Sequence, residues 1–168
     1  SLALHLENLD PRVELALTSA GVTTPLGASA TPGLRRTVTL DFADEGTASE
    51  AVWIRGERPC PPRYRIAVTA DVQTGQAQLA TILEQLAHEA MLAEIDEEPL
   101  LGLVILGDLT EWSEDDEFDA LRQLLAEAPI PVAVTPGNHD VLNNSSSPFH
   151  TSFGPGNHTF EVCTTKFA

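Results

Sequence analysis

The stretch that decides the fold is PGNHD at residues 136–140, which directly follows the short apolar run of residues 130–134. An amide, an imidazole and a carboxylate, from Asn138, His139 and Asp140, therefore stand side by side where a strand would end. Side chains of these kinds bind metal ions or move protons. The pentapeptide alone is only suggestive, so its meaning depends on whether other segments repeat the arrangement.

Two earlier segments do repeat the arrangement of an apolar strand followed by polar ligands. The first is YRIAVTA at residues 64–70, which leads to Asp71 and Gln73. The second is the apolar run of residues 100–106, which leads to Asp108. In open parallel sheets, functional sites form at the carboxyl ends of the strands. We therefore expect the three strand ends to meet at one site.

The composition excludes some classes of partner. Of the 168 residues, which suffice for one domain or for one domain and part of another, 42% are apolar. Nine basic and 25 acidic residues give a net charge of -16, and residues 66–121 contain no Lys or Arg. Because nucleic acids and anionic membranes attract clustered Lys or Arg, we expect neither as a partner. No apolar run approaches the ~20 residues that span a bilayer, so we expect no transmembrane segment.

The cysteines and the first residue leave the compartment open. The sequence does not say whether Cys60 and Cys163 pair, and two cysteines say little about the redox environment. No signal segment opens the chain. The chain begins at Ser1 and not at Met, so a leader removed before this point remains an option.

Residues 1–58 differ in pattern from the rest. Three segments alternate between polar and apolar residues, as half-buried strands do: residues 13–17, 37–42 and 51–55. Clusters of Gly, Pro, Ser and Thr at residues 23–27 and 30–33 predict turns. We therefore expect a small β-strand module, part of an immunoglobulin- or fibronectin-like sandwich, followed by a proline-rich linker at residues 59–63.

From residue 64 onward, strand and helix patterns alternate, which predicts an α/β (α+β) fold with a parallel sheet. Apolar residues at helical spacing predict one helix over residues 76–95 and another over residues 114–128. We expect Ser113 to cap the second helix and Pro129 to end it. The polar residues 143–148 predict a loop, and residues 159–166 predict a final strand.

The side chains at the three strand ends suit divalent cations. Hard cations prefer oxygen ligands, and borderline ones also accept imidazole. Asp71, Gln73, Asp108 and Asn138 are therefore suitable ligands. Two ions about 4 Å apart need a bridging carboxylate, and Asp108 is the natural candidate because it follows the middle strand. His139 could then protonate a departing oxygen, oriented by a nearby carboxylate.

The order of these motifs resembles the calcineurin-like metallophosphoesterase superfamily. The patterns D-x-(H/Q), G-D-x-x-(D/E) and G-N-H-(D/E) occur in this order within residues 64–168. The segment FGPGNHTF at residues 153–160 is also similar to one that often follows the third motif. The resemblance implies an αββα sandwich with its metal ions at the strand ends. It covers the amino-terminal portion of that catalytic domain.

The resemblance also implies a role for each ligand. Asp71 and Gln73 would hold the first metal ion, Asp108 would bridge two ions, and Asn138 would hold the second. The ions would be divalent, with Mn, Fe or Zn as the candidates. Gln73 departs from the commonest pattern, which has histidine there, and a neutral amide is the weaker ligand.

Two further residues would complete the chemistry. The resemblance makes His139 the proton donor and places Glu111 where the family has the carboxylate that orients this histidine. Asn138 and His139 would also contact the substrate. The family's remaining metal-ligating histidines, including a G-H-x-H motif, do not occur before the chain ends at Ala168. The sheet is therefore expected to be half-built, with an exposed apolar side.

Two hypotheses about function follow. The first is a metal-dependent phosphoesterase that hydrolyses a small phosphate mono- or diester. The alternative is a non-catalytic phosphoesterase-like binding or surface protein, either a pseudoenzyme or an incomplete fragment, and Gln73 and the missing histidines motivate it. A β module before such a domain is similar to extracytoplasmic phosphoesterases, with a cytoplasmic location as the alternative. The substrate, the metal ion and the oligomeric state stay open.

Overall fold

The computed structural model describes residues 2–10, 12–19, 21–26, 34–40, 53–57, 60–92, 97–144, 147–157, 159–163 and 165–167. The chain divides into two compact units, Ser1–Cys60 and Pro61–Ala168. The predicted linker at residues 59–63 spans this division, whereas the predicted turn at residues 30–33 lies outside the described residues. None of the described helices is long and apolar enough to cross a membrane.

The first unit is built from antiparallel strands. β1 (Leu2–Leu6) pairs with β4 (Arg36–Leu40), whereas β2 (Glu14–Ser19) pairs with both β3 (Val22–Leu26) and β5 (Trp53–Glu57). Burial alternates strictly along β4, as the period-2 pattern predicts. The buried core of the unit comprises Leu15, Val38 and Leu40. An immunoglobulin- or fibronectin-like arrangement of this unit stays a prediction.

The predicted turn at residues 23–27 is wrong. Residues 22–26 form β3, which is an edge strand because β2 separates it from β5. Pro25 is compatible with an edge strand, since its missing N–H need not face a neighbour. The reversal lies earlier, where Gly21 has the left-handed φ of 76°.

An ion pair between buried Asp10 and exposed Arg12 organises the segment before β2. The carboxylate of Asp10 is almost fully buried and accepts hydrogen bonds from the main-chain N–H of Arg12 at 2.8 Å and from its Nε at 3.0 Å. The buried guanidinium of Arg36 donates to the carbonyl oxygens of Asp10 and Val13. These contacts satisfy the polar groups that the fold removes from water.

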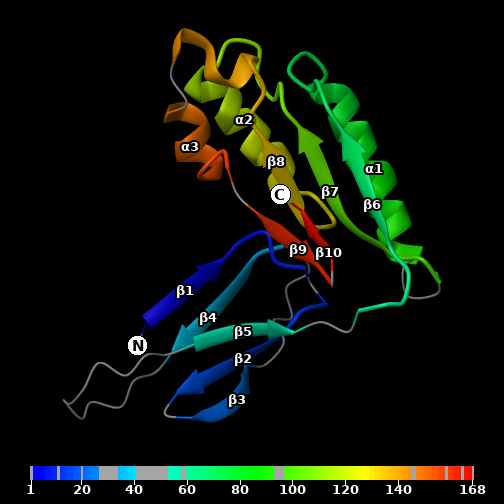
Figure 1. Ribbon diagram of the computed structural model, residues 1–168, viewed down its shortest axis with the longest axis vertical. Coiled ribbons are helices and arrows are strands. Elements are labelled where there is room, and N and C mark those ends of the chain that lie inside the picture. Colours follow the sequence, from blue (N-terminus) through cyan, green and yellow to red (C-terminus); the bar gives the residue numbers. More distant parts are fainter. Residues whose placement is uncertain are drawn as a thin grey trace. The chain divides into compact units, whose positions relative to one another are not determined.

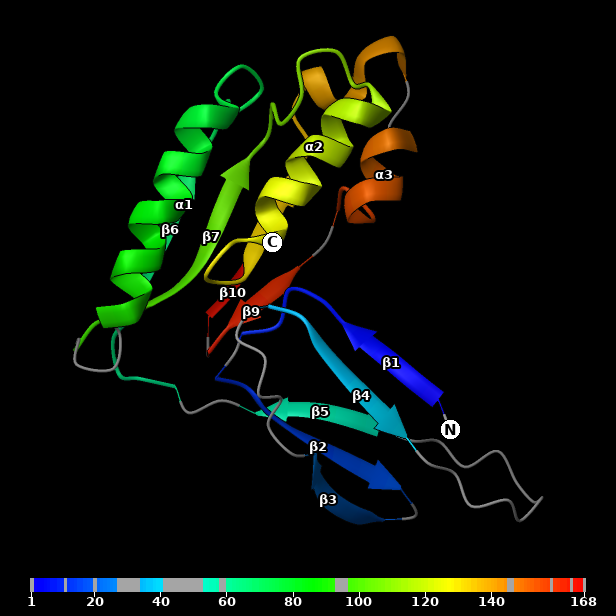
Figure 2. The same ribbon diagram turned by 180° about the vertical axis from the view of Figure 1, so that it is seen from behind.

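The second unit contains the predicted parallel sheet. The strands β6 (Arg65–Thr69), β7 (Leu100–Leu106) and β8 (Val132–Thr135) lie in the order β6-β7-β8. The helices α1 (Gln76–Met91) and α2 (Asp115–Ala126) form the two crossovers and cover the same face of the sheet (Figures 1 and 2). This mixed α/β architecture, preceded by an all-β unit, confirms the expected fold class.

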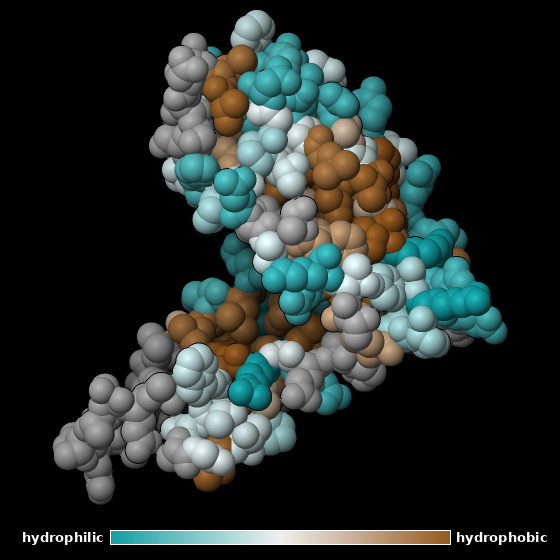
Figure 3. Space-filling model, in the orientation of Figure 1, coloured by the Kyte–Doolittle hydropathy of each residue, from teal (hydrophilic) through white to brown (hydrophobic). Residues whose placement is uncertain are grey.

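The other face of the sheet is apolar and partly open. Strand alternation puts Leu101, Leu103 and Ile105 on one face, where all three are almost fully buried. Val68 and Leu106 lie on the opposite face and are 60% and 52% exposed. Figure 3 shows apolar side chains gathered over this side of the unit. The exposed apolar side of the sheet that the sequence predicts is therefore present.

Both helices differ in their ends from the prediction. α1 ends at Met91, with Leu92 as its C-cap, and residues 93–96 lie outside the described part of the chain. The N-cap of α2 is Glu114 and not Ser113. Ser113 has a left-handed φ of 61°, and its hydroxyl donates to the carbonyl of Asp140, so it belongs to the preceding loop. α2 ends at Ala126, before the proline at 129.

The segment after β8 is more ordered than the sequence predicts. The predicted loop at residues 143–148 overlaps the 3₁₀ helix η2 (His139–Asn144) and α3 (Ser147–Phe153). α3 packs against α2 because Phe149 and Phe153 both meet Phe118 edge-on, with ring centroids 6.3 and 6.2 Å apart. A buried aromatic cluster thus fixes a segment whose flanking residues are polar.

The predicted final strand is a hairpin. β9 (Phe160–Val162) and β10 (Thr165–Phe167) pair antiparallel, and Cys163 in the connecting turn has a left-handed φ of 55°. The hydroxyl of Tyr64 donates to the carbonyl of Val162 at 3.2 Å. The two cysteines are both disulfide-bonded, which settles the question that the sequence left open.

Candidate active site

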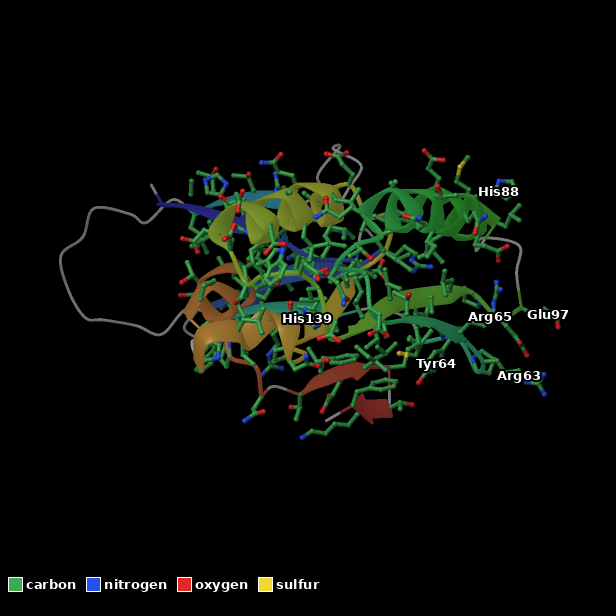
Figure 4. All side chains as sticks on the ribbon, turned by 90° about the horizontal axis from the view of Figure 1, so that it is seen from above. Arg63, Tyr64, Arg65, His88, Glu97 and His139 are labelled. Atoms are coloured by element: carbon green, nitrogen blue, oxygen red, sulfur yellow. The ribbon has the colours of Figure 1, made fainter. Side chains whose placement is uncertain are left out.

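Three strand ends bring the candidate ligands to one edge of the sheet. Because β6, β7 and β8 are parallel, their carboxyl ends lie at the same edge, where Asp71, Asp108 and Asn138 follow the respective strands. Figure 4 shows His139 at this end of the sheet and Arg63 and Arg65 at the other.

Main-chain hydrogen bonds connect the first two loops. The N–H of Asp71 donates to the carbonyl of Gly107 at 3.2 Å, and the N–H of Gln73 donates to the carbonyl of Asp108 at 3.0 Å. These bonds continue the pairing of β6 and β7 beyond the strand ends. The loop that carries the first two predicted ligands is thereby held against the loop that carries Asp108.

Both aspartates at the strand ends have a left-handed backbone. The φ angle is 54° at Asp71 and 50° at Asp108. Left-handed geometry costs a non-glycine residue roughly 1–2 kcal/mol, although aspartate tolerates it better than most. Strain of this kind is concentrated at functional sites, where the surrounding structure enforces it.

Two glycines let the second and third loops touch. Gly107 has a φ of 71°, and a Cβ built on it would lie 2.9 Å from the Cα and N atoms of Gly137. A Cβ on Gly137 would in turn overlap the main-chain N and the carboxylate of Asp108. The glycines of the G-D and G-N motifs are therefore required by the direct approach of the two backbones.

His139 is anchored to the second loop at two points. Its main-chain N–H donates to Oδ1 of Asp108 at 3.1 Å, and its Nδ1 lies 2.9 Å from the carbonyl oxygen of Glu111. A carbonyl oxygen can only accept, so Nδ1 carries the hydrogen. This contact fixes the plane of the imidazole ring and leaves Nε2 as the nitrogen that can serve chemistry.

Glu111 contacts His139 through a different atom from the one the sequence suggests. The resemblance assigns this role to the carboxylate, whereas the structure places the main-chain carbonyl oxygen against Nδ1. The carboxylate acts on His139 only through its charge. A main-chain acceptor at this position does not depend on side-chain length, so Glu in place of the commoner Asp leaves the contact intact.

The pKa of His139 is raised above its ordinary value of 6.5. The largest cause is the hydrogen bond to the Glu111 carbonyl, and partial desolvation opposes it. Further increases come from the charges of three carboxylates, Asp108, Glu111 and Asp140. At a given pH near neutrality, a larger fraction of His139 is therefore protonated than of an unperturbed imidazole.

Asp140 is a buried carboxylate whose function the sequence did not reveal. It ends the pentapeptide and was one of three side chains there that could bind a metal ion or move a proton. The structure buries it fully, and its oxygens accept hydrogen bonds from main-chain N–H groups of Leu109, Thr110 and Gly137. With these donors around it, Asp140 connects the second and third loops instead of facing the site.

Gln73 provides a direct test of whether the site fits a cation. Its Oε1 is buried. Among the side-chain oxygens and nitrogens of the described residues, it is the buried atom without a hydrogen-bond partner. A buried acceptor left without a donor costs about 1–3 kcal/mol. A divalent cation would satisfy this oxygen, because hard cations prefer oxygen ligands. The donor set of two carboxylates and two amides thus fits such an ion.

The acidic and imidazole side chains alone do not make a complete site. Among the residues that the structure describes, no group of three or more His, Cys, Asp or Glu could hold a metal ion. Asp71 and Asp108 are the carboxylates of the candidate set, and the other two members are the amides Gln73 and Asn138. Binding at this edge would therefore depend on the amide oxygens.

Comparison with known protein families shows which family the chain is related to. The model of the calcineurin-like phosphoesterase family matches residues 64–167. The chain belongs to the calcineurin-like phosphoesterase family. This match confirms the predicted resemblance, and it includes the three loops of the candidate site. Comparisons with curated proteins and with solved structures gave no match.

Proposed function

We propose that this calcineurin-like phosphoesterase chain serves the hydrolysis of a small phosphate mono- or diester at a centre for two divalent cations. The observation that carries the proposal is the convergence of three loops on Asp108, one of which carries Gln73 with its buried and unpartnered Oε1. The net charge of -16 disfavours nucleic acid as a substrate. Mn, Fe and Zn are the candidate metals.

Asp71 and Gln73 would hold the first ion, Asp108 would be shared, and Asn138 would hold the second. When bound, such a pair of ions polarises a phosphoryl group and activates a water for attack on it. The chain's own contribution is to fix the ligands in advance. The left-handed backbone of the two aspartates and the hydrogen bonds between their loops support this role.

His139 would donate a proton to the departing oxygen. The carbonyl of Glu111 holds Nδ1–H, so Nε2 is the nitrogen from which the proton would leave. The raised pKa keeps a larger fraction of the ring protonated near neutral pH in the metal-free protein. The same ring could bind the substrate phosphate together with Asn138.

An activity assay with a matched histidine control tests the proposal. An aryl phosphate monoester and a diester are supplied with Mn²⁺, Fe²⁺ or Zn²⁺, to the wild type and to the variants His139→Ala and His88→Ala. His88 is exposed on α1, and Figure 4 shows it well away from His139. We expect turnover to fall about 10²–10⁴-fold in His139→Ala and to persist in His88→Ala. Turnover that is equal in all three proteins would contradict the proposal.

A non-catalytic binding protein is the second candidate. Two observations favour it: an amide stands at position 73, and the described residues lack a cluster of three acidic or imidazole ligands. Under this function, the site would bind a phosphorylated ligand without turnover. Stoichiometric binding of an aryl phosphate with no hydrolysis under any of the three metals would favour this candidate.

An oxidising compartment fits the cysteines best. Both Cys60 and Cys163 are disulfide-bonded, and disulfides persist mainly in extracytoplasmic environments. We therefore propose an extracytoplasmic or secreted location. Mass spectrometry of non-reduced protein from its native compartment, with thiols blocked at lysis, would detect the disulfide. Recovery of both cysteines as blocked thiols would support a cytoplasmic location instead.

A further inference from the structure

Asp140 is the buried titratable group that the proposed reaction does not use. Its Oδ1 accepts hydrogen bonds from the N–H of Leu109 at 2.9 Å and from the N–H and hydroxyl of Thr110 at 2.9 and 3.0 Å. Its Oδ2 accepts from the N–H of Leu109 at 3.0 Å and of Gly137 at 2.8 Å. Residue 140 thus joins its own loop to the loop that carries Asp108.

The partners of this carboxylate flank the functional residues on both sides. Leu109 and Thr110 directly follow Asp108, and Gly137 directly precedes Asn138. Asp140 itself comes directly after His139. The hydrogen bonds therefore restrain the chain on either side of the residues that would bind metal ions and substrate.

We propose that Asp140 is a positioning residue, which holds the loop after β7 against the loop after β8 and so assembles the site before any ion binds. The expected effect on metal binding rests on the proposed function, whereas the contacts between the two loops do not. It assigns Asp140 no contact with the substrate or with a metal ion.

The hydrogen bonds at residue 140 require a side chain with two acceptor oxygens. All of its partners are N–H or O–H donors, so both oxygens must accept. An asparagine of the same shape would turn an NH₂ group toward at least one of these donors. Leu109 could still donate to the remaining oxygen, but the N–H of either Gly137 or Thr110 would lose its acceptor and be left without this partner.

A second carboxylate fixes the remainder of the same loop. Oε1 of Glu117 accepts from the N–H of Glu111 at 3.0 Å, and its Oε2 accepts from the N–H groups of Trp112 and Glu114, both at 3.0 Å. Glu111, whose carbonyl receives Nδ1–H of His139, thus directly follows the two residues that bond to Asp140 and itself bonds to Glu117. Of these two carboxylates, Asp140 is the one that also bonds to the loop after β8, through the N–H of Gly137.

A merely structural role makes a different prediction from a positioning role. A buried, hydrogen-bonded carboxylate that only supports folding lowers stability when it is replaced and leaves the folded site unchanged. A positioning residue changes the site within the folded state. The main-chain N–H of His139 reports this difference, because it bonds to Asp108 and not to Asp140.

The test uses four variants of the whole chain. Asp140→Asn removes the charge, Thr110→Val removes one donor from a fully buried position, and Thr110→Ser restores the hydroxyl. Asp10→Asn is the matched control, since it changes a buried, hydrogen-bonded carboxylate in the other unit. Amide hydrogen exchange of His139 is measured by NMR without metal, and Mn²⁺ binding is measured by calorimetry.

In Asp140→Asn we expect the His139 amide to exchange at least about tenfold faster while the amides of α1 keep their protection. We expect its affinity for Mn²⁺ to fall about 10–100-fold, the usual effect of losing an outer partner of a metal site. Thr110→Val should change both quantities in the same direction but less, and Thr110→Ser should restore them. Asp10→Asn should change neither.

Two results would overturn the inference. One is unchanged exchange at His139 in a folded Asp140→Asn protein. The other is an equal increase of exchange in Asp10→Asn, which would indicate general destabilisation. If the wild type bound no Mn²⁺, the proposed function would be contradicted, and the exchange data, which need no metal, would still decide the role of Asp140.

Discussion

The main-chain N–H of His139 donates a hydrogen bond to Oδ1 of Asp108 at 3.1 Å. This bond joins the proposed proton donor to the proposed bridging ligand, although 31 residues separate them in the chain. The loops of Gly107 and Gly137 make the bond possible, because a side chain on either would separate the two backbones. The site is therefore a property of two loops in contact, and changes in either loop should affect both.

Gln73→Met should stabilise the metal-free protein and weaken metal binding. The substitution removes the buried, unpartnered Oε1 and keeps the length of the side chain. We therefore expect the free energy of unfolding of the metal-free protein to rise by about 1 kcal/mol. We expect Mn²⁺ to bind about tenfold more weakly, because one oxygen ligand is lost. Urea unfolding and calorimetry measure the two effects. Gln78→Met on the exposed side of α1 should change neither, and a loss of stability at position 73 would contradict the ligand role.

Gly137→Ala should damage the site more than the sheet. The new Cβ would overlap the main-chain N of Asp108, so the second loop must move. We expect about 1–3 kcal/mol of destabilisation, typical of overpacking, together with loss of Mn²⁺ binding. The control is Gly102→Ala in β7, whose Cβ would have its nearest contacts at 3.5 and 3.6 Å. Equal metal affinity in the Gly137 variant and the wild type would contradict the close packing of the loops.

His139 should titrate above 6.5 in the metal-free protein. The hydrogen bond to the Glu111 carbonyl is the main cause, and the charge of Asp108 adds to it. A raised folded-state pKa stabilises the protein below the unfolded value of 6.5, and this contribution is lost as the pH rises through the folded value. NMR titration of the ring measures the pKa. Asp108→Asn should lower it toward 6.5, and a value below 6.5 in the wild type would contradict the observed contacts.

Loss of the disulfide should destabilise the chain. Reduction of disulfide-bonded Cys60 and Cys163 should lower the free energy of unfolding by about 2–5 kcal/mol, chiefly because the unfolded chain gains freedom. Urea unfolding with and without a reductant measures the difference. The double variant Cys60→Ser/Cys163→Ser should be insensitive to the reductant. An oxidised wild type as unstable as this variant would show that the bond contributes nothing.

The sequence predicted the elements that depend on local periodicity. β7 was predicted at residues 100–106 and is observed there, and its continuous apolar run fits its position between two other strands. The family and the position of Asp108 at a strand end were also accessible, since the motifs are local. The metal-binding and catalytic roles assigned to these residues stay predictions.

What the sequence missed depends on contacts between distant segments. Asp140 was noticed only as a side chain that could bind a metal ion or move a proton, because its donors at positions 109 and 110 are 31 and 30 residues away. The hairpin at β9 and β10 was predicted as one strand, since nothing local marks Cys163 for a left-handed turn. α3 is held in place by the packing of Phe149 on Phe118, and the polar residues around Phe149 along the chain gave no sign of this contact.

Calorimetric titration of Mn²⁺ into the wild type and Asp108→Asn tests the central claim most directly. The claim is that three loops form one cation site around Asp108. It predicts saturable binding to the wild type and an affinity at least about 100-fold weaker in a variant whose circular dichroism is unchanged. Equal affinities in the two proteins would contradict the claim, because the ion would then bind without the residue on which all three loops converge.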